Sequence, residues 1–156
     1  ARLLGLPDPG SRAAACVWFS APEAPHGVGR YIALDGGPGP ARNVAVLSAV
    51  APTYAPGGRA LVAAAVPGTT GGSELAAAVR TQLTGWFGPE VASWELLRVD
   101  RIEHGHPDQR APLEARRAVA LGEDRYVCGD HRDTASIQGA LFSGRRTAEA
   151  ILAARR

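Results

Sequence analysis

An acidic residue beside the start of a helix is the feature of this sequence that best supports chemistry. Asp130 follows Gly129 at the end of a short apolar run, residues 126–128, and a helical pattern begins near Ser136. A serine at that position can cap the free backbone N–H groups of the first helical turn. The positive end of the helix dipole also attracts negative charge. A carboxylate and a set of free N–H groups could together bind a polar or anionic ligand.

The helix that follows is unusually poor in side-chain volume. Small residues stand at positions 139, 140, 143, 144 and 148. A glycine inside a helix costs roughly 1 kcal/mol relative to alanine. Two such glycines, Gly139 and Gly144, predict that a helix, a sheet or a ligand comes close to this backbone. The larger apolar residues share one stripe at helical spacing: Ile137, Leu141, Ala148, Ile151 and Leu152.

Two histidines raise the alternative of a metal site. His104 and His106 stand two residues apart, and alternate residues of a strand point to the same face, so both could bind one ion. Gly105 and Pro107 favour a loop, however, and no spacing fixes a third ligand. We therefore expect a solvated loop over residues 104–112 and no metal site.

Hydrolase and phosphate-loop chemistry find no support in the sequence. No serine stands in a G-x-S-x-G context. Residues 68–73, GTTGGS, precede a helical pattern but lack the lysine of a phosphate-binding loop. We interpret them as a plain connection between a strand and a helix.

Strand-length apolar runs joined by short turns predict an antiparallel meander in the first half of the chain. The runs cover residues 13–20, 29–34, 43–50 and 59–66. A helix follows over residues 73–87, with Ser73 as a candidate cap and Gly88-Pro89 as its end. The remaining predicted elements are a strand over 94–102, a short helical turn over 113–117, and the last strand and helix, which Arg155 and Arg156 close.

The stretch from Tyr126 to Leu152 resembles the C-terminal cofactor motif of FAD-dependent amine oxidases and phytoene desaturases. The matching residues are Gly129-Asp130, Ser136-Ile137-Gln138-Gly139-Ala140, Ser143-Gly144-Arg145 and Ala148. The resemblance implies that Asp130 binds the ribityl–pyrophosphate part of FAD and that the backbone of Ile137 and Gln138 lies near the flavin O2. It makes the candidate cofactor-binding residues Gly129, Asp130, Ser136, Ile137, Gln138 and Gly139. His131 and Asp133 are then loop residues or contacts near the flavin, and no general base is nominated.

The resemblance extends over most of the chain and implies an α/β architecture in two parts. Residues 1–112 resemble the antiparallel sheet and helix of a substrate domain. Residues 113–156 resemble the last strand and helix of a Rossmann-like FAD-binding domain. The G-x-G-x-x-G turn that binds the ADP half of FAD in such enzymes is not in this sequence. The chain is therefore similar to the last third of a flavoenzyme that oxidises a C–N or C–C bond of a small-molecule substrate by hydride transfer to FAD.

The alternative is a non-catalytic binding or interaction module that keeps this fold. In either case the apolar runs at residues 13–20 and 126–128 would leave faces uncovered. We expect an N-terminal FAD-domain segment or a second copy of the chain to cover them. The isolated chain would then be inactive and would not be a stable monomer.

Composition excludes some partners and suggests a source. The net charge is only +2, without a basic tract, so nucleic-acid binding is not indicated. No apolar run approaches the ~18 residues of a membrane span. All 17 basic residues are arginine, which suggests a bacterial, GC-rich genome, and the absence of methionine suggests a processed or partial chain. Cys16 and Cys128 stand in apolar runs and are predicted to be buried free thiols of a cytoplasmic protein.

Overall fold

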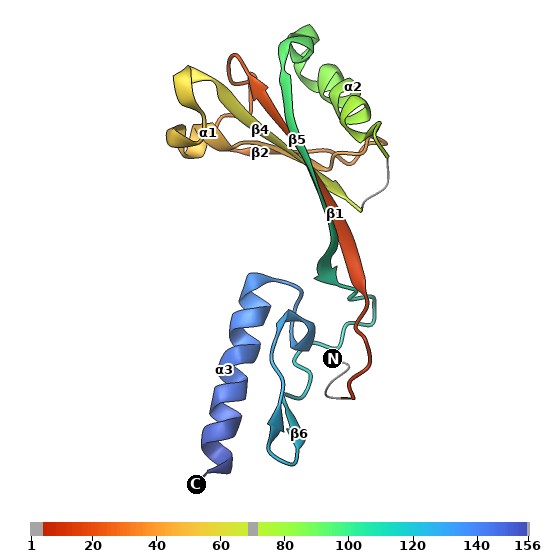
Figure 1. Cartoon of the computed structure of the whole chain (residues 1–156), viewed down its shortest axis with the longest axis vertical. Helices are drawn as coiled ribbons and strands as arrows, with labels where there is room; N and C mark the ends of the chain where they lie inside the picture. The colour runs from red at the N-terminus through yellow and green to blue at the C-terminus, as the bar shows by residue number, and fades with distance from the viewer. Residues whose placement is uncertain (1–4, 69–71, 156) are drawn as a thin grey trace. The chain divides into compact units, whose positions relative to one another are not determined.

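The computed structural model describes residues 5–68 and 72–155 (Figure 1). The chain divides into two compact units, one of residues 13–103 and one of residues 1–12 and 104–156. It passes between them twice, once within strand β1 (Ser11–Ala21) and once within strand β5 (Glu95–Pro107). The sequence predicts a boundary between a substrate domain and a cofactor domain at residues 112 and 113. That boundary stays a prediction.

The unit of residues 13–103 is built on a five-stranded sheet with the strand order β2-β3-β4-β1-β5. β2 (Ile32–Leu34) is an edge strand, and β3 (Asn43–Val46) and β4 (Ala60–Pro67) are inner strands. β2 pairs with β3, β3 with β4 and β4 with β1, each time antiparallel. The predicted meander is therefore present in β2-β3-β4, but the first strand lies between β4 and β5 and not at the edge of the sheet.

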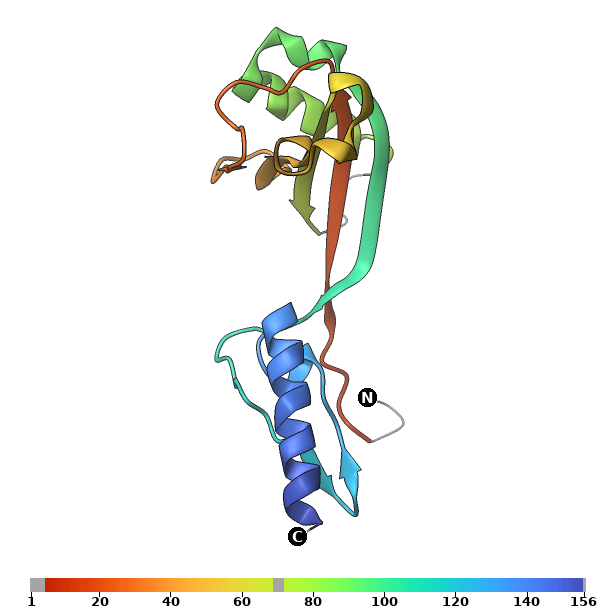
Figure 2. The same cartoon turned by 90° about the vertical axis from the view of Figure 1, so that its left-hand side faces the viewer.

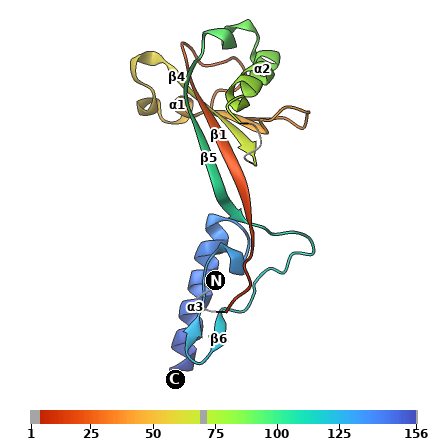
Figure 3. The ribbon, with the colours of Figure 1, turned by 45° about the vertical axis from the view of Figure 1, so that its right-hand side comes forward.

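Helix α2 (Leu75–Phe87) covers one face of this sheet (Figure 3). Alternate side chains of β1 and β4 point into the core, and α2 contributes Leu75, Val79 and Leu83. Phe19, Phe87 and Trp94 stack in the same core, with ring centroids 6.0 and 5.8 Å apart, and Trp86 contacts Phe87. The prediction that Ser73 caps this helix is wrong. Glu74 is the N-cap residue, and its side chain makes no capping hydrogen bond.

Two predicted strands of this unit are shorter in the structure. Residues 47–50 form the short helix α1 (Leu47–Val50) instead of prolonging β3. The Ser48 hydroxyl accepts a hydrogen bond from the Leu61 N–H at 3.0 Å, so a side chain takes the place of strand pairing there. Only Ile32–Leu34 of residues 29–34 is a strand. Between α1 and β4 the chain makes two short 3-10 turns, Pro52–Tyr54 and Pro56–Gly58.

β5 is longer than predicted and includes the first residues of the loop expected at 104–112. The strand runs to Pro107, and the Ser11 hydroxyl and His104 Nδ1 lie 2.7 Å apart in a hydrogen bond. A neighbouring strand therefore gives His104 a partner, which the local Gly and Pro residues did not indicate. A 3-10 turn, Pro89–Ser93, precedes β5. Of the predicted connection 68–73, residues 69–71 lie outside the described residues.

The second unit contains a small hairpin, a 3-10 turn and one long helix. The hairpin pairs β6 (Ala120–Gly122) with β7 (Arg125–Tyr126) and is followed by η5 (Asp130–Arg132) and α3 (Ile137–Ala154). α3 lies alongside the hairpin (Figure 2). The strand predicted at 126–128 is largely wrong: only Tyr126 belongs to a strand, although the Val127 N–H still donates to the Val119 carbonyl at 2.9 Å. The helical turn predicted at 113–117 is absent from the described chain.

The α3 face that packs against its own unit is small and polar. Its buried residues are Gly139, Ser143 and Thr147. The apolar stripe points the other way, since Ile137 is 78% exposed, Leu141 69% and Leu152 64%. No helix in the described parts of the chain is long and apolar enough to cross a membrane.

Candidate functional site

Gly129 and Asp130 form a turn that leaves the carboxylate unpaired. Gly129 has φ 138°, a conformation that residues with a side chain rarely adopt. A Cβ there would also lie 2.6 Å from Nδ1 of His131. The chain then enters η5 at Asp130, whose side chain makes no hydrogen bond or ion pair with any residue in 5–68 or 72–155. A half-buried carboxylate without a partner retains its full capacity to accept hydrogen bonds from a ligand.

The start of α3 offers donors to the same kind of ligand. Ser136 is the N-cap, as predicted, and its hydroxyl accepts a hydrogen bond from the Gly139 N–H at 2.9 Å. The next intrahelical bond runs from the Ala140 N–H to the Ser136 carbonyl. The N–H groups of Ile137 and Gln138 find no acceptor in the described part of the chain. The helix therefore begins with two free donors at the positive end of its dipole.

Gly139 holds the loop against the helix. A Cβ on Gly139 would stand 1.9 Å from the Thr134 carbonyl oxygen, which no side chain could tolerate without backbone movement. The prediction of a close approach is thus confirmed here, and the neighbour is this chain's own loop. Gly144 differs, since a Cβ there would meet no described atom within 4 Å.

Two hydroxyls of α3 fix the segment that leads to Asp130, and sequence reasoning missed their role. The Ser143 hydroxyl accepts from the Gly129 N–H and donates to the Ala140 carbonyl, each at 2.9 Å. The Thr147 hydroxyl contacts the Val127 carbonyl at 3.2 Å and the Ser143 carbonyl at 2.8 Å. The 127–129 segment thus obtains from side chains the bonds that a neighbouring strand would otherwise supply.

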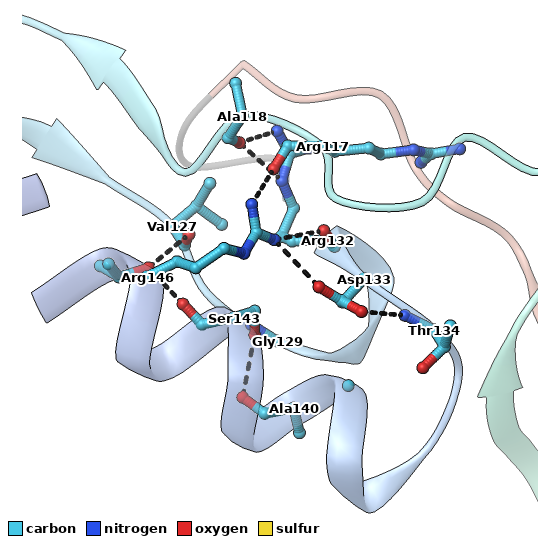
Figure 4. Close-up of polar contacts among 12 residues, drawn as sticks. Arg117, Ala118, Val127, Gly129, Arg132, Asp133, Thr134, Ala140, Ser143 and Arg146 are labelled. Carbon is cyan, nitrogen blue, oxygen red and sulfur yellow. Dashed lines mark hydrogen bonds and ion pairs between the residues drawn. The ribbon is translucent and has the colours of Figure 1, made fainter. Parts of the chain in front are cut away.

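A buried ion pair anchors the loop between Asp130 and α3 (Figure 4). Asp133 is 8% exposed, and its carboxylate lies 3.3 Å from Nη2 of Arg146. The same guanidinium donates to the Arg132 carbonyl at 2.9 Å and to the Arg117 carbonyl at 3.1 Å. Asp133 is therefore a structural residue, one of the two roles expected for it.

Gln109 ties the same loop from outside the helix. Its amide donates to the Asp133 carbonyl at 2.7 Å and accepts from the Ala135 N–H at 2.8 Å. The Gln109 amide thus donates and accepts one hydrogen bond each, as the backbone of a neighbouring strand would. No local pattern around Gln109 signals it, because its partners lie 24 to 26 residues further along the chain.

His131 is poorly suited to carry a positive charge. Burial lowers the pKa of its imidazole, and the nearby Arg132 charge lowers it further, against an opposing effect of Asp130. The ring is therefore neutral near neutral pH. Across residues 5–68 and 72–155 no group of three or more His, Cys, Asp or Glu side chains could hold a metal ion.

The cysteine predictions are partly corrected. Both cysteines are free, as expected, but Cys128 is exposed and Cys16 is half-buried. Burial raises the pKa of the Cys16 thiol to about 11, and the negative charge of Asp100 adds to this effect. Cys128 is exposed because the 126–128 run is held by α3 hydroxyls and is not enclosed in a sheet.

Comparison with protein families gives one match that spans nearly the whole chain. The model for flavin-containing amine oxidoreductases matches residues 8–152. No curated protein matches the sequence at a significant level.

Proposed function

Because the chain belongs to the flavin-containing amine oxidoreductase family, we propose that it supplies the loop and helix end that hold FAD in a flavin-dependent oxidoreductase. The family implies a flavin, and FAD is the form that we propose. The observation that carries the proposal is the unpaired carboxylate of Asp130 beside a helix that begins with two free N–H groups. A dinucleotide flavin carries hydroxyl donors on its ribityl chain and carbonyl acceptors on its ring, which match these two features.

Each residue of the site has a distinct task in this proposal. The Asp130 carboxylate would accept hydrogen bonds from the ribityl segment. The N–H groups of Ile137 and Gln138 would donate to the pyrimidine edge of the ring and stabilise negative charge there. Gly129, Ser136 and Gly139 would position these groups, through an open turn, a cap and a close loop contact. The bound flavin would supply the redox chemistry, which in this class is hydride transfer from a C–N or C–C bond of a small molecule.

The sheet of residues 13–103 would contribute to the substrate side. In this proposal it is the substrate-domain part of the enzyme, and residues 113–156 are the last strand and helix of a Rossmann-like FAD-binding domain. The G-x-G-x-x-G turn would come from an N-terminal segment or a partner chain. The exposed stripe of Ile137, Leu141 and Leu152 supports such a covering partner, because apolar side chains at helical spacing favour burial.

A second candidate follows from the same stripe. If the chain binds a partner but no flavin, it is an interaction module that retains the fold of its family. The two candidates differ in whether Asp130 affects flavin binding, so one ligand titration separates them.

The test is a titration of the purified chain with FAD, followed by quenching of flavin fluorescence and by the visible absorption band. We expect saturable binding that Asp130→Asn weakens. Asp124→Asn is the matched control, because Asp124 lies in the β6–β7 turn with φ 54° and asparagine tolerates that conformation. Binding that is equal in all three proteins would contradict the role of Asp130. No binding by the wild-type chain would show that this chain alone does not hold FAD.

A further inference from the structure

A cavity of about 570 Å³ lies on a different face of α3 from the buried small residues. Its walls come from the loop at residues 115–116, from residues 133–134 and from the α3 side chains at positions 138, 142, 145, 146 and 149. All of these belong to one unit. The volume is within the range of pockets that bind small molecules, roughly 300 to 1,000 Å³.

The charges that line this cavity do not cancel. Asp133 is paired with Arg146 at 3.3 Å, and Glu149 with Arg145 at 2.8 Å. These two pairs account for both acidic side chains of the lining. Arg116 remains, and its guanidinium has no ion pair or hydrogen bond with any residue in the described ranges. The cavity therefore carries one unbalanced positive charge.

Hydrogen bonds hold the Arg146 side chain at the wall of the cavity. Its guanidinium donates to the main-chain carbonyls of Arg117 and Arg132 and is paired with Asp133. Burial lowers the pKa of Arg132, and the charges of Arg117 and Arg146 lower it further, against an opposing effect of Glu114. Nε of Arg146 is buried and has no hydrogen-bond partner in the described structure. The charge of this guanidinium is balanced by Asp133, so Arg146 positions the wall of the cavity and Arg116 carries the unbalanced charge.

The cavity also offers an apolar surface. Phe142 lines it, and this side chain is 57% exposed. Gln138 lies one turn before Phe142 on the same helix and adds an amide that can donate or accept. An exposed aromatic ring beside guanidinium groups is suited to a flat ring that carries an oxyanion, since arginine binds carboxylate and phosphate with paired N–H donors.

We propose that this cavity binds an aromatic oxyanion, a phosphate or carboxylate carried on a flat apolar ring, with Arg116 as the principal contact of the anion and Phe142 as the contact of the ring. Arg146 holds the wall of the cavity in place through Asp133 and the two carbonyls. The cavity borders the proposed flavin site, because the Gln138 side chain lines it, but Asp130 and Ile137 are not among its lining residues.

The test uses phenyl phosphate and benzoate as probes, followed by amide NMR shifts of the whole chain at low ionic strength. We expect saturable shifts at Gln138, Phe142 and Glu149, and weaker binding as salt is added. Either probe alone supports the proposal and identifies which oxyanion is preferred. Phenol and inorganic phosphate should each bind more weakly than phenyl phosphate, because each lacks one half of the contact.

Variants distinguish binding in this cavity from nonspecific attraction of an anionic probe to a positively charged protein. Arg116→Gln should weaken binding by about tenfold or more, the size expected for one charge-assisted contact. Arg125→Gln is the matched control, because Arg125 lies in β7, is paired with Glu123 and does not line the cavity. Phe142→Ala should weaken the aromatic probes but not inorganic phosphate. Asp130→Asn should leave probe binding unchanged, so that failure of the flavin proposal remains distinguishable.

Three outcomes would overturn the proposal. The first is no saturable binding of either probe, the second is equal loss in Arg116→Gln and Arg125→Gln, and the third is phenol binding as tightly as phenyl phosphate. None of the variants removes Arg146, so a folding defect of the loop does not enter the comparison.

Discussion

The Ser143 hydroxyl accepts a hydrogen bond from the Gly129 N–H at 2.9 Å, and through it the helix positions the turn that presents Asp130. Ser143 is fully buried and also donates to the Ala140 carbonyl. A residue in the middle of α3 thus controls the backbone at the candidate site. This relationship motivates the first two predictions, which concern the attachment of the turn to the helix.

Ser143→Ala is expected to destabilise the helix–turn contact by about 1–3 kcal/mol, because the half-buried Gly129 N–H loses its acceptor. Hydrogen exchange of the Gly129 amide should accelerate with it. Thr81→Ala is the control: that hydroxyl bonds to the Ala77 carbonyl on the exposed side of a helix, and its loss should cost little. Unchanged Gly129 exchange in Ser143→Ala would show that the turn does not depend on this bond.

Two glycine substitutions in α3 should have opposite effects. Gly139→Ala places a methyl group against the Thr134 carbonyl, and such overpacking typically costs about 1–3 kcal/mol or more. Gly144→Ala meets no described atom and should stabilise the helix by up to about 1 kcal/mol. Hydrogen exchange of the α3 amides measures both. If Gly144→Ala is as harmful as Gly139→Ala, a partner must contact Gly144 in solution.

The two cysteines should react at very different rates. The Cys16 thiol has a pKa of about 11, so near neutral pH almost none of it is the reactive thiolate. Cys128 is exposed. A disulfide reagent should therefore label one thiol rapidly and the second only after denaturation. Cys128→Ser should abolish the rapid phase, and persistence of that phase in the variant would place the reactive thiol at Cys16.

Gln82→Leu should raise the pKa of Asp35. The Gly37 N–H is the main cause of the low pKa of this carboxyl, and the Gln82 amide, which donates to it at 2.9 Å, is the second. The variant should therefore raise the value without restoring it fully. Carboxyl NMR measures the shift, and Asp108, whose pKa is lowered chiefly by Arg12, is an internal control that should not move.

The lowered pKa of Asp35 also makes the stability of the folded chain depend on pH. A lowered pKa in the folded state means that Asp35 contributes stability above its unfolded value of about 3.9. That contribution is lost as the pH falls through the lower folded value. In Gln82→Leu the contribution should be smaller and its loss should be complete at a higher pH than in the wild type, and identical acid unfolding curves would contradict this linkage.

Replacing Leu141 and Leu152 together by glutamine should increase solubility and reduce self-association. Both side chains are largely exposed on α3 and make up part of the apolar stripe. Sedimentation velocity of the variant and the wild type measures the effect. A wild-type chain that remains monomeric at high concentration would show that the stripe does not mediate self-association.

In the second unit the sequence predicted helix α3 but neither the β6–β7 hairpin nor the packing of the helix. Ser136, the helix that it caps and the close approach at Gly139 were all recognisable, because capping and glycine in a helix are local signals. The orientation of α3 was not, because its buried face is made of Gly139, Ser143 and Thr147, which hydropathy does not mark as a core. Gln109 and Arg146 act over long sequence separations, so no local pattern could identify them.

The first unit shows the same limit for a different reason. The strands β1 and β4 were recognisable from their apolar runs, but the place of β1 between β4 and β5 depends on pairing between distant segments. Residues 47–50 are as apolar as the strand before them. Tertiary contacts distinguish the helix from a longer strand: the Ser48 hydroxyl accepts from the Leu61 N–H, and Arg30 donates to the Ala49 carbonyl.

The location of the aromatic residues gives the molecule two separate spectroscopic reporters. Trp18, Trp86 and Trp94 all belong to the unit of residues 13–103, and two of them contact its aromatic cluster. Indole emission therefore reports the unfolding of that unit alone, whereas α3 contributes the longest helix to the circular dichroism signal. A denaturation curve recorded by both probes would reveal whether the two units unfold in one step or independently.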